Sequence, residues 1–354
     1  MKLKRLIDVL VPITACNFRC HYCYVTQQEQ IKGRIPQLPD VALIKKAFSK
    51  KRLGGACYIN FCGQGETLLQ PEIPAIVAAL LQEGHFIVVI TNGSLPDPID
   101  ELLKLPKVLR QRLMFLASFH FLELKRLGLI EHYFSTIKKM RAAGVSFNSI
   151  MTVCDELIPY KDEIKEMCIR NLGAYCNIAV GRDDTKVSKP ILTSLSENEY
   201  SNIWSDFNSE LFKFQMSNWG VKQTNFCYAG DIWSTVNLET GDLKQCYSST
   251  NLLQNIYSNV NEPIKWKAYG RNCLEPHCFN GVAAFSIGAV PALNKTVPSW
   301  IALRNKVCTD GTEWFNPTLK KLLSTKMQRS PIQRLLVEHC GSQKLTFGTN
   351  QLFF

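Results

Sequence analysis

The sequence predicts an α/β protein: a parallel β-sheet curled into a partial barrel, followed by a smaller domain of a β-hairpin and helices. Short buried-strand runs alternate with helical runs through the first half of the chain, and this alternation predicts the barrel. A second group of cysteines, spread over turn-rich sequence after residue 226, predicts the smaller domain. Functional side chains of such a barrel are expected at the carboxyl ends of its strands.

The expected elements follow one another in a regular order. An apolar stretch over residues 6–13 opens the chain, a short strand over 58–62 comes next, and a helix over 71–84 follows that strand. Pro71 suits the start of this helix and Gly84 suits its end. Further strands are expected at 86–90, 113–119, 145–153 and 176–180, with helices inside 128–144 and 160–171. Repeated units of this length predict a parallel sheet with right-handed crossovers, curled into a full or partial barrel.

Composition and charge set limits on the function. The chain has 354 residues, and its apolar stretches are too short to span a membrane. Its 14 cysteines, without a convincing secretory signal, indicate metal ligands and reduced thiols in a cytoplasmic setting. The net charge of +11 favours an anionic partner, such as a phosphorylated sugar or an acidic peptide. The chain has no RNA-binding signature and no dense basic block interleaved with aromatics, which argues against nucleic acid.

Three cysteines near the start, Cys16, Cys20 and Cys23, are the strongest functional signal. Three thiolates on one loop hold three corners of a 4Fe-4S cluster and leave the fourth iron open to a small molecule. The C-x3-C-x2-C spacing, with the aromatic Tyr22 before the last cysteine, resembles the signature of the radical S-adenosylmethionine (SAM) superfamily. The resemblance implies a partial (β/α)6 radical SAM barrel of the TIM type, in which the open iron binds SAM. Reduction by a flavodoxin or ferredoxin then yields a 5'-deoxyadenosyl radical, which abstracts hydrogen from a C–H bond.

Two other interpretations of the cysteine triplet stay open. A zinc ion is possible with His21 as the fourth ligand, although zinc motifs usually bring cysteines in two separated pairs. Alternatively, residues 1–16 form a lipoprotein signal that ends at Cys16, although Asp8 interrupts its apolar run.

A glycine-rich run directly follows the strand at 58–62. Its residues Gly63, Gly65 and Glu66 resemble the radical SAM motif whose backbone carbonyls and acidic side chain receive the ammonium group of SAM. Thr67 replaces the usual proline. The glycines are expected to let the backbone approach the ligand closely, while an ordinary glycine turn remains the alternative.

Other candidate SAM ligands lie at later strand ends. Thr91 and Asn92 resemble the Thr-Asn-Gly of the third strand, although Asn-Gly is also an ordinary turn. Ser118 and His120 are placed to reach the SAM ribose or the substrate, and a core histidine is the alternative. Arg182 suits the SAM carboxylate, with a solvated arginine as the alternative.

The second cysteine group comprises Cys227, Cys246, Cys273 and Cys278. Its spacing resembles the twitch domain, a shortened SPASM domain that holds one auxiliary 4Fe-4S cluster. The closing pair has four intervening residues instead of two, and a structural zinc ion is the alternative. Four thiolates would coordinate the cluster fully, which suits electron transfer or shaping of the substrate pocket.

The expected domain organisation has four parts. Residues 1–185 form the barrel, 186–225 a linker with an amphipathic helix, 226–280 the twitch-like domain and 281–354 an extension of unknown role. The extension is expected to line a pocket with residues 281–298 and to form a helix over 313–327. Its cysteines Cys308 and Cys340 are candidate hydrogen-atom donors, although a free cysteine is more often a buried apolar residue.

We expect hydrogen abstraction from a carbohydrate or aminocyclitol-like substrate, leading to dehydrogenation, epimerisation or dehydration. Maturation of a ribosomally made peptide, by epimerisation or crosslinking, is the alternative. Peptide-modifying relatives often carry a winged-helix domain before the barrel, and the cluster motif at Cys16 leaves no room for one. A non-enzymatic iron–sulfur electron carrier does not explain the open cluster corner.

Overall fold

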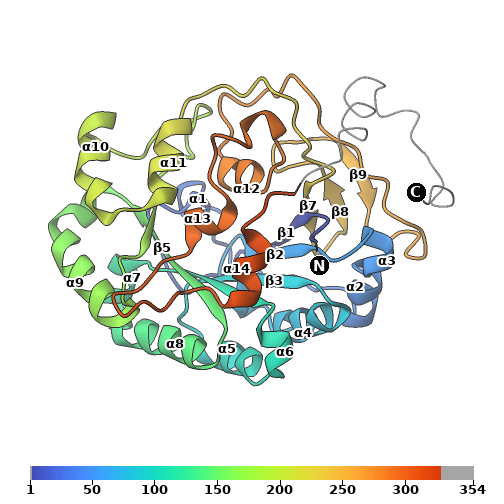
Figure 1. Cartoon of the computed structure of the whole chain (residues 1–354), viewed down its shortest axis with the longest axis horizontal. Coiled ribbons are helices and arrows are strands. Elements are labelled where there is room, and N and C mark those ends of the chain that lie inside the picture. Colours follow the sequence, from blue (N-terminus) through green and yellow to red (C-terminus); the bar gives the residue numbers. More distant parts are fainter. Residues whose placement is uncertain (1, 328–354) are drawn as a thin grey trace.

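The computed structural model describes residues 2–327 (Figure 1). Within them, nine strands form one sheet in the order β6-β5-β4-β3-β2-β1-β7-β8-β9. Strands β1 to β7 are parallel to their neighbours, and β8 and β9 add an antiparallel hairpin. The strands are β1 (Leu6–Val11), β2 (Tyr58–Gly63), β3 (Phe86–Thr91), β4 (Leu113–Ser118), β5 (Ser146–Val153), β6 (Asn177–Val180), β7 (Trp233–Asn237), β8 (Asp242–Lys244) and β9 (Leu252–Asn255).

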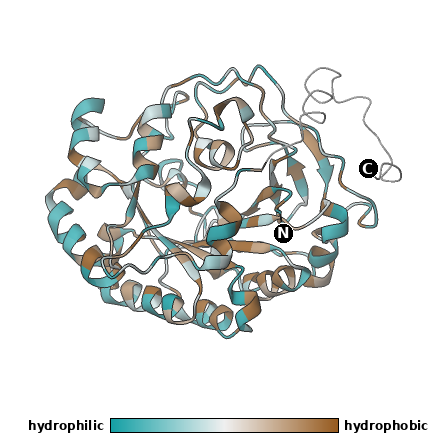
Figure 2. Ribbon diagram, in the orientation of Figure 1, coloured by the Kyte–Doolittle hydropathy of each residue, from teal (hydrophilic) through white to brown (hydrophobic). Residues whose placement is uncertain are grey.

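Helices of the barrel lie between successive strands and cover the outside of the sheet (Figure 1). The strands are mostly hydrophobic, whereas the helices mix both kinds of residue, which suits a layer between core and water (Figure 2). These helices are α1 (Tyr24–Gln27), α2 (Val41–Ala47), α3 (Lys50–Leu53), α4 (Ile73–Glu83), α5 (Pro96–Leu103), α6 (Lys107–Arg110), α7 (Phe121–Arg126), α8 (Ile130–Ala142) and α9 (Lys161–Leu172).

The predicted α/β fold with a parallel, barrel-forming sheet is confirmed. The β-hairpin region is not a separate layer, however, because β7 pairs with β1 and continues the same sheet. The register joins Leu6 to Trp233 and Leu10 to Asn237. The twitch-like region is therefore tied to the barrel by a ladder of backbone hydrogen bonds.

Two expected helices differ in extent. The amphipathic helix expected within residues 186–225 is divided into α10 (Glu197–Trp204) and α11 (Glu210–Asn218), because Asn208 between them adopts a left-handed conformation with φ of 48°. Ser209 then caps α11 by accepting a hydrogen bond from the Phe212 amide. The helix expected over 313–327 is limited to α14 (Pro317–Leu323), which begins after the capping residue Asn316.

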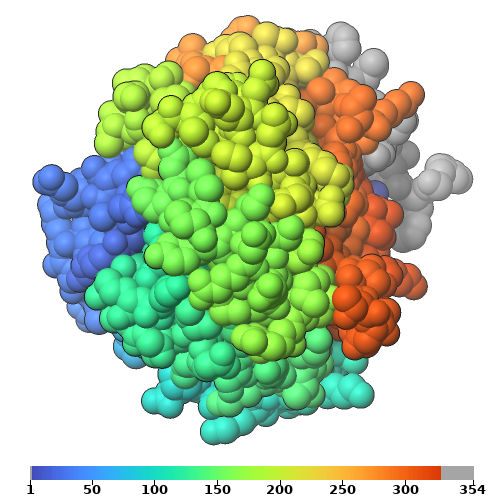
Figure 3. Space-filling view, turned by 90° about the vertical axis from the view of Figure 1, so that its left-hand side faces the viewer, coloured from blue at the N-terminus to red at the C-terminus, as the bar shows by residue number. Residues whose placement is uncertain are grey.

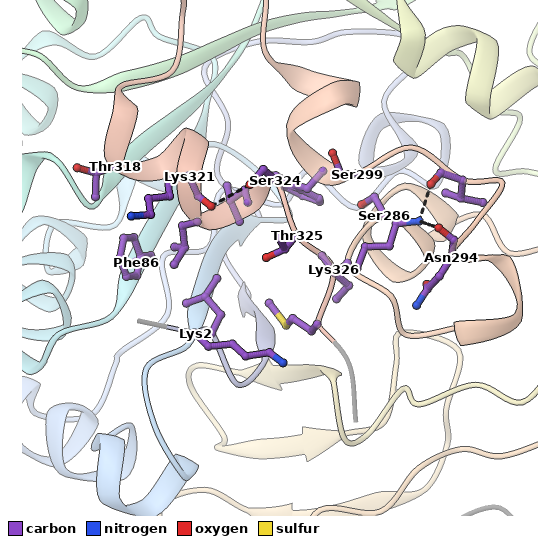
Figure 4. A pocket seen from close by; sticks show the side chains of 17 residues that line it. Lys2, Phe86, Ser286, Asn294, Ser299, Thr318, Lys321, Ser324, Thr325 and Lys326 are labelled. Carbon is purple, nitrogen blue, oxygen red and sulfur yellow. Dashed lines mark hydrogen bonds between the residues drawn. The ribbon is translucent and has the colours of Figure 1, made fainter. Parts of the chain in front are cut away.

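The described part of the C-terminal extension, residues 281–327, folds into α12 (Gly281–Ser286), α13 (Trp300–Arg304) and α14. In the space-filling view its orange and red residues border the green part of the barrel (Figure 3). With the first residues of the chain and of β3, it surrounds a hollow of about 1060 Å³ (Figure 4). Ser286, Ile287, Asn294 and Val297 line this hollow, as expected for the 281–298 segment. Because Phe86 is the first residue of β3, the hollow lies at the amino ends of the strands.

Candidate active site

The cysteine triplet lies on the loop between β1 and α1, at the carboxyl end of β1. Backbone hydrogen bonds fix the start of this loop against the glycine motif after β2. The Gly65 amide donates to Ile13 O at 2.6 Å, and the Glu66 amide donates to Ala15 O at 3.0 Å. The two predicted motifs are therefore held together by their own main chains.

A cavity of about 150 Å³ joins the triplet to most of the predicted SAM ligands. Cys16, Cys20 and Cys23 line it together with residues from the ends of β2, β3 and β4. The predicted residues among these are Gly63, Gly65, Glu66, Thr91, Asn92, Ser118 and His120. The larger hollow of Figure 4 lies at the other end of the strands and includes none of the cysteines.

Glu66 is the main connection between two strand ends. Its carboxylate accepts hydrogen bonds from the Thr91 hydroxyl at 2.7 Å, the Asn92 amide at 2.8 Å and the Leu68 amide at 3.0 Å. The side chain is buried, and burial raises its pKa, while these three donors oppose the shift. Glu66 therefore fixes the loops after β2 and β3 in one geometry.

The glycines of the motif are needed for a second reason, besides the expected approach of a ligand. A Cβ at Gly65 would lie 2.0 Å from Ala15 O, and a Cβ at Gly63 would lie 2.8 Å from Gly65 O. These atoms belong to the chain's own backbone. The glycines thus allow the cysteine loop and the motif loop to pack directly against each other.

The Asn17 side chain and the Arg19 backbone amide attach the cysteine loop to neighbouring strand ends. Asn17 accepts a hydrogen bond from the Asn92 side chain at 2.9 Å and donates to the Ser94 hydroxyl at 2.8 Å. On the other side, the Arg19 amide donates to the Glu123 carboxylate at 2.8 Å. Sequence reasoning missed Asn17 and Glu123, because their roles depend on contacts 75 and 104 residues apart in the chain.

The Tyr22 and His120 side chains form a hydrogen bond with each other. The Tyr22 hydroxyl lies 2.7 Å from His120 Nδ1, and Phe18 packs edge-on against the imidazole. Burial lowers the pKa of His120 to about 4, so the ring is neutral at physiological pH. His120 faces the cavity, whereas Tyr22 lies behind it and supports the imidazole.

Several predicted residues lie away from this cavity. Arg182 forms an ion pair with Asp184 at 2.8 Å and stacks over Phe279, and it does not line the cavity. Cys308 packs against Gly173 and lies 3.3 Å from Leu172 O, at the C-terminus of α9 and near the amino end of β6. This is the opposite end of the barrel from the triplet. Cys340 lies outside the described residues.

The triplet offers thiols and no other strong ligand. Burial raises the pKa of all three thiols, that of Cys20 to about 12, so they need a cation to become thiolates. His21 instead pairs with Glu156 at 3.2 Å and groups with Cys154, which argues against it as a fourth ligand of the triplet. These three donors fit the three protein-held corners of a 4Fe-4S cluster.

The four later cysteines, Cys227, Cys246, Cys273 and Cys278, line a second, smaller cavity of about 40 Å³. Burial raises the pKa of Cys227 to about 12, and the neighbouring thiols Cys246 and Cys273 raise it further. Cys227 is fixed by a pair of backbone hydrogen bonds with Gly270, at 2.9 and 3.0 Å. The sequence-predicted set is thus brought together around one space.

The distances between sulfur atoms in both cysteine sets can be compared with those around a single zinc ion. A tetrahedral zinc site with Zn–S bonds of about 2.3 Å holds its sulfurs about 3.8 Å apart. Within residues 2–327, His21, Cys154 and Glu156 form the one group of three or more metal-ligating side chains whose donor atoms all lie within 4.8 Å. In neither cysteine set do three sulfur atoms all lie within 4.8 Å of one another, so both sets are wider than a zinc site requires.

Comparison with known proteins agrees with this arrangement. Residues 10–166 match the radical SAM superfamily. The chain contains a radical SAM domain. This domain spans β1 to β5 and includes the cysteine triplet and the glycine motif. A 90-residue part of the chain is 32% identical to the 7-carboxy-7-deazaguanine synthase of Aquifex aeolicus, covering 25% of this chain and 38% of that protein.

Two solved structures share the radical SAM fold. One is Streptococcus suis SuiB bound to S-adenosylmethionine, with a TM-score of 0.50, 14% identity, and coverage of 73% of this chain and 65% of SuiB. The other is anSMEcpe with bound AdoMet and the Cp18Cys peptide, with a TM-score of 0.50, 14% identity, and coverage of 72% and 78%. The chain matches less than two thirds of the synthase and of SuiB. Among residues 2–327, no helix has the length and hydrophobicity of a membrane span.

Proposed function

We propose that the protein is a radical SAM enzyme that abstracts a hydrogen atom from a C–H bond. The cavity at the carboxyl ends of β1 to β4 carries this proposal, because it joins three thiols to seven of the predicted SAM ligands. Cys16, Cys20 and Cys23 would hold a 4Fe-4S cluster. When bound, the cluster supplies the electron that cleaves SAM to a 5'-deoxyadenosyl radical.

The chain's own residues would bind and orient SAM beside this cluster. The exposed backbone of Gly63 to Glu66 offers carbonyl groups to an ammonium, and the buried Glu66 carboxylate adds negative charge next to them. Neutral His120, held by Tyr22, presents a ring nitrogen without adding charge. Phe18, Val25 and Ile90 surround the same cavity with apolar groups, which limits the entry of water.

We propose that the four later cysteines hold a second 4Fe-4S cluster in a twitch-like arrangement. Their shared cavity and their open spacing support a multi-iron cluster over a single zinc ion. Anaerobically reconstituted protein is then expected to contain about eight irons per chain. Replacing Cys246 with alanine should lower this to about four, and stoichiometric zinc in the purified protein would contradict the second cluster.

For the substrate, we propose a small carbohydrate or aminocyclitol that undergoes dehydrogenation, epimerisation or dehydration. Maturation of a ribosomal peptide is the second candidate, and SuiB, which has been solved with its precursor peptide SuiA, shares the fold. A flavodoxin or ferredoxin in a reducing cytoplasm would supply the electron.

The proposed function is tested by SAM cleavage. Reconstituted protein with SAM and dithionite is expected to release 5'-deoxyadenosine, and Cys20→Ala should abolish this release. Cys57→Ala is the matched control, because Cys57 is equally buried but lies just before β2, at the amino end of the barrel. Equal release by wild type and Cys20→Ala would refute the assignment.

A further inference from the structure

The inner face of the barrel is partly exposed at the carboxyl ends of its strands. At the carboxyl end of each strand from β1 to β7, the residues that share the inner face are only half-buried, whereas their outward neighbours such as Val9, Phe61 and Val89 are fully buried. These inner residues are Leu10, Cys62, Ile90, Ser118, Ile150, Thr152, Ala179 and Asn237. The register pairs Leu10 with Cys62 and Asn237, Ser118 with Ile150, and Thr152 with Ala179, whereas Ile90 pairs with the buried Leu116.

In the layer directly below these residues, β1, β2 and β5 carry polar side chains, whereas β3 and β4 carry Val88 and Leu116. Asp8, Asn60 and Asn148 stand two residues before Leu10, Cys62 and Ile150 on the same faces of their strands, and all three are buried. Parallel barrels usually fill such layers with branched apolar residues. A polar layer at this depth therefore needs an explanation other than packing.

Arg304 enters this layer from α13. Its backbone carbonyl accepts a hydrogen bond from Asn177 at the start of β6, while its guanidinium lies in the electrostatic range of Tyr58 and Asp8 on β2 and β1. The guanidinium stacks on Trp300 at 4.0 Å, and Trp300 packs edge-on against Tyr58. The Arg304 backbone thus lies beside β6, and its guanidinium lies over Trp300, which contacts Tyr58 on β2.

Among the described residues, the Arg304 guanidinium has no acceptor. The residue is only 8% exposed, yet within residues 2–327 it donates no hydrogen bond and forms no ion pair, and its Nε is fully buried without a partner. Asp8 does not fill this role, because it lies within electrostatic range of the guanidinium but forms no ion pair with it; its oxygens accept instead from Asn60 at 2.9 Å and Trp233 at 2.7 Å. A buried charge without hydrogen bonds is strongly unfavourable, so an acceptor from outside the chain is expected.

Two further buried atoms of the same layer lack partners. Asn60 Oδ1 is an acceptor without a donor, and its orientation is fixed because Asn60 Nδ2 must donate to Asp8. Asn148 Nδ2 is a donor without an acceptor, since Asn148 Oδ1 already receives the Asn177 amide. The layer therefore offers one guanidinium, one more donor and one acceptor to a ligand.

We propose that Arg304 is a substrate-recognition residue that binds an oxyanion, a carboxylate or a phosphate, of the substrate in the barrel interior. This inference rests on the proposed function, because it places the substrate between Arg304 and the radical site. The planar guanidinium matches the paired oxygens of both groups. Asn60 Oδ1 would accept from a substrate hydroxyl or amine, which suits a polar, sugar-like molecule with one anionic group.

The test uses the full chain, reconstituted anaerobically and saturated with SAM. Inorganic phosphate and acetate serve as separate probes, titrated by calorimetry at ionic strength held constant with chloride. We expect saturable binding of one equivalent of at least one probe to wild type. Saturation by phosphate indicates a phosphorylated substrate, and saturation by acetate indicates a carboxylate.

Variants then locate the site. Arg304→Gln should weaken probe binding at least tenfold, and Arg304→Lys, which keeps the charge but loses the fork, should weaken it to an intermediate degree. Lys321→Gln is the control, because Lys321 lines the separate hollow at the amino ends of the strands and should leave affinity unchanged (Figure 4). A purely structural Arg304 would lower the melting temperature of its variants without changing probe affinity, and that result would overturn the inference.

Two outcomes separate this inference from the proposed function. If wild type releases 5'-deoxyadenosine but neither probe saturates, or if both probes bind Arg304→Gln as tightly as wild type, the inference fails alone. If wild type releases no 5'-deoxyadenosine, the proposed function fails whatever the probes show. The wild-type titration gives this answer even if an Arg304 variant does not fold.

Discussion

Gly65→Ala tests whether the contact between the cysteine loop and the glycine motif positions the cluster. The new Cβ would lie 2.0 Å from Ala15 O and 2.7 Å from the Ala15 carbonyl carbon, both backbone atoms. Because Cβ atoms do not approach other atoms closer than 3.0 Å, the two loops must separate by about 1 Å. That movement breaks or weakens the hydrogen bonds from Gly65 and Glu66 to Ile13 and Ala15.

Each of these backbone hydrogen bonds contributes about 1 kcal/mol, and the steric strain adds a similar amount. We therefore expect a loss of about 2–4 kcal/mol in unfolding free energy and less than half of the wild-type iron at the triplet. Iron content and denaturant unfolding of the anaerobic protein measure both effects. Gly128→Ala is the control, since its Cβ would meet nothing within 4 Å and only its left-handed backbone, worth about 1–2 kcal/mol, is strained. Equal iron content in the two variants would refute the reasoning.

Three further predictions concern single side chains. Glu66→Gln should lower SAM affinity at least tenfold and the free energy of unfolding by about 1–3 kcal/mol, because its new NH2 group faces existing donors. Equilibrium dialysis measures the affinity, and Glu101→Gln is an exposed control. Burial lowers the pKa of His85 to about 4, against about 6.5 in the unfolded chain. As the pH is lowered from 6.5 to 4, the free energy of unfolding should therefore fall by up to about 1.4 kcal/mol per pH unit. The slope of acid denaturation should be smaller in His85→Gln, and an unchanged slope would contradict this origin. Cys308→Ala should leave substrate turnover within twofold of wild type, because Cys308 lies at the far end of the barrel from the triplet. A variant that still cleaves SAM but forms no product would show instead that Cys308 is the hydrogen-atom donor.

The strands of the barrel could be predicted because they are buried on both faces and read as short apolar runs. The cavity residues followed from the same logic, since the ends of parallel strands meet at one edge of the sheet. The break between α10 and α11 could not be predicted from apolar spacing. It depends on Ser209, whose hydroxyl accepts from both Phe212 on α11 and Ile178 on β6.

The residues that sequence reasoning missed depend on long-range contacts. Arg304 belongs to a segment without any motif, and only the fold shows that its side chain enters the barrel. The role of Gly65 was expected to concern the ligand, and the structure adds its close contact with Ala15. Arg182 follows a strand end as expected, but the neighbouring Asp184 occupies its guanidinium.

The pairing of β1 with β7 has a consequence for electron transfer between the two proposed clusters. The triplet directly follows β1, and Cys246 follows the β7–β8 hairpin, so one hydrogen-bonded ladder connects both. Swinging one centre away from the other would require five consecutive residue pairs of this ladder to part, from Leu6 with Trp233 to Leu10 with Asn237. The ladder would therefore keep the two proposed clusters at a fixed separation, so that hinge motion would not limit electron transfer between them.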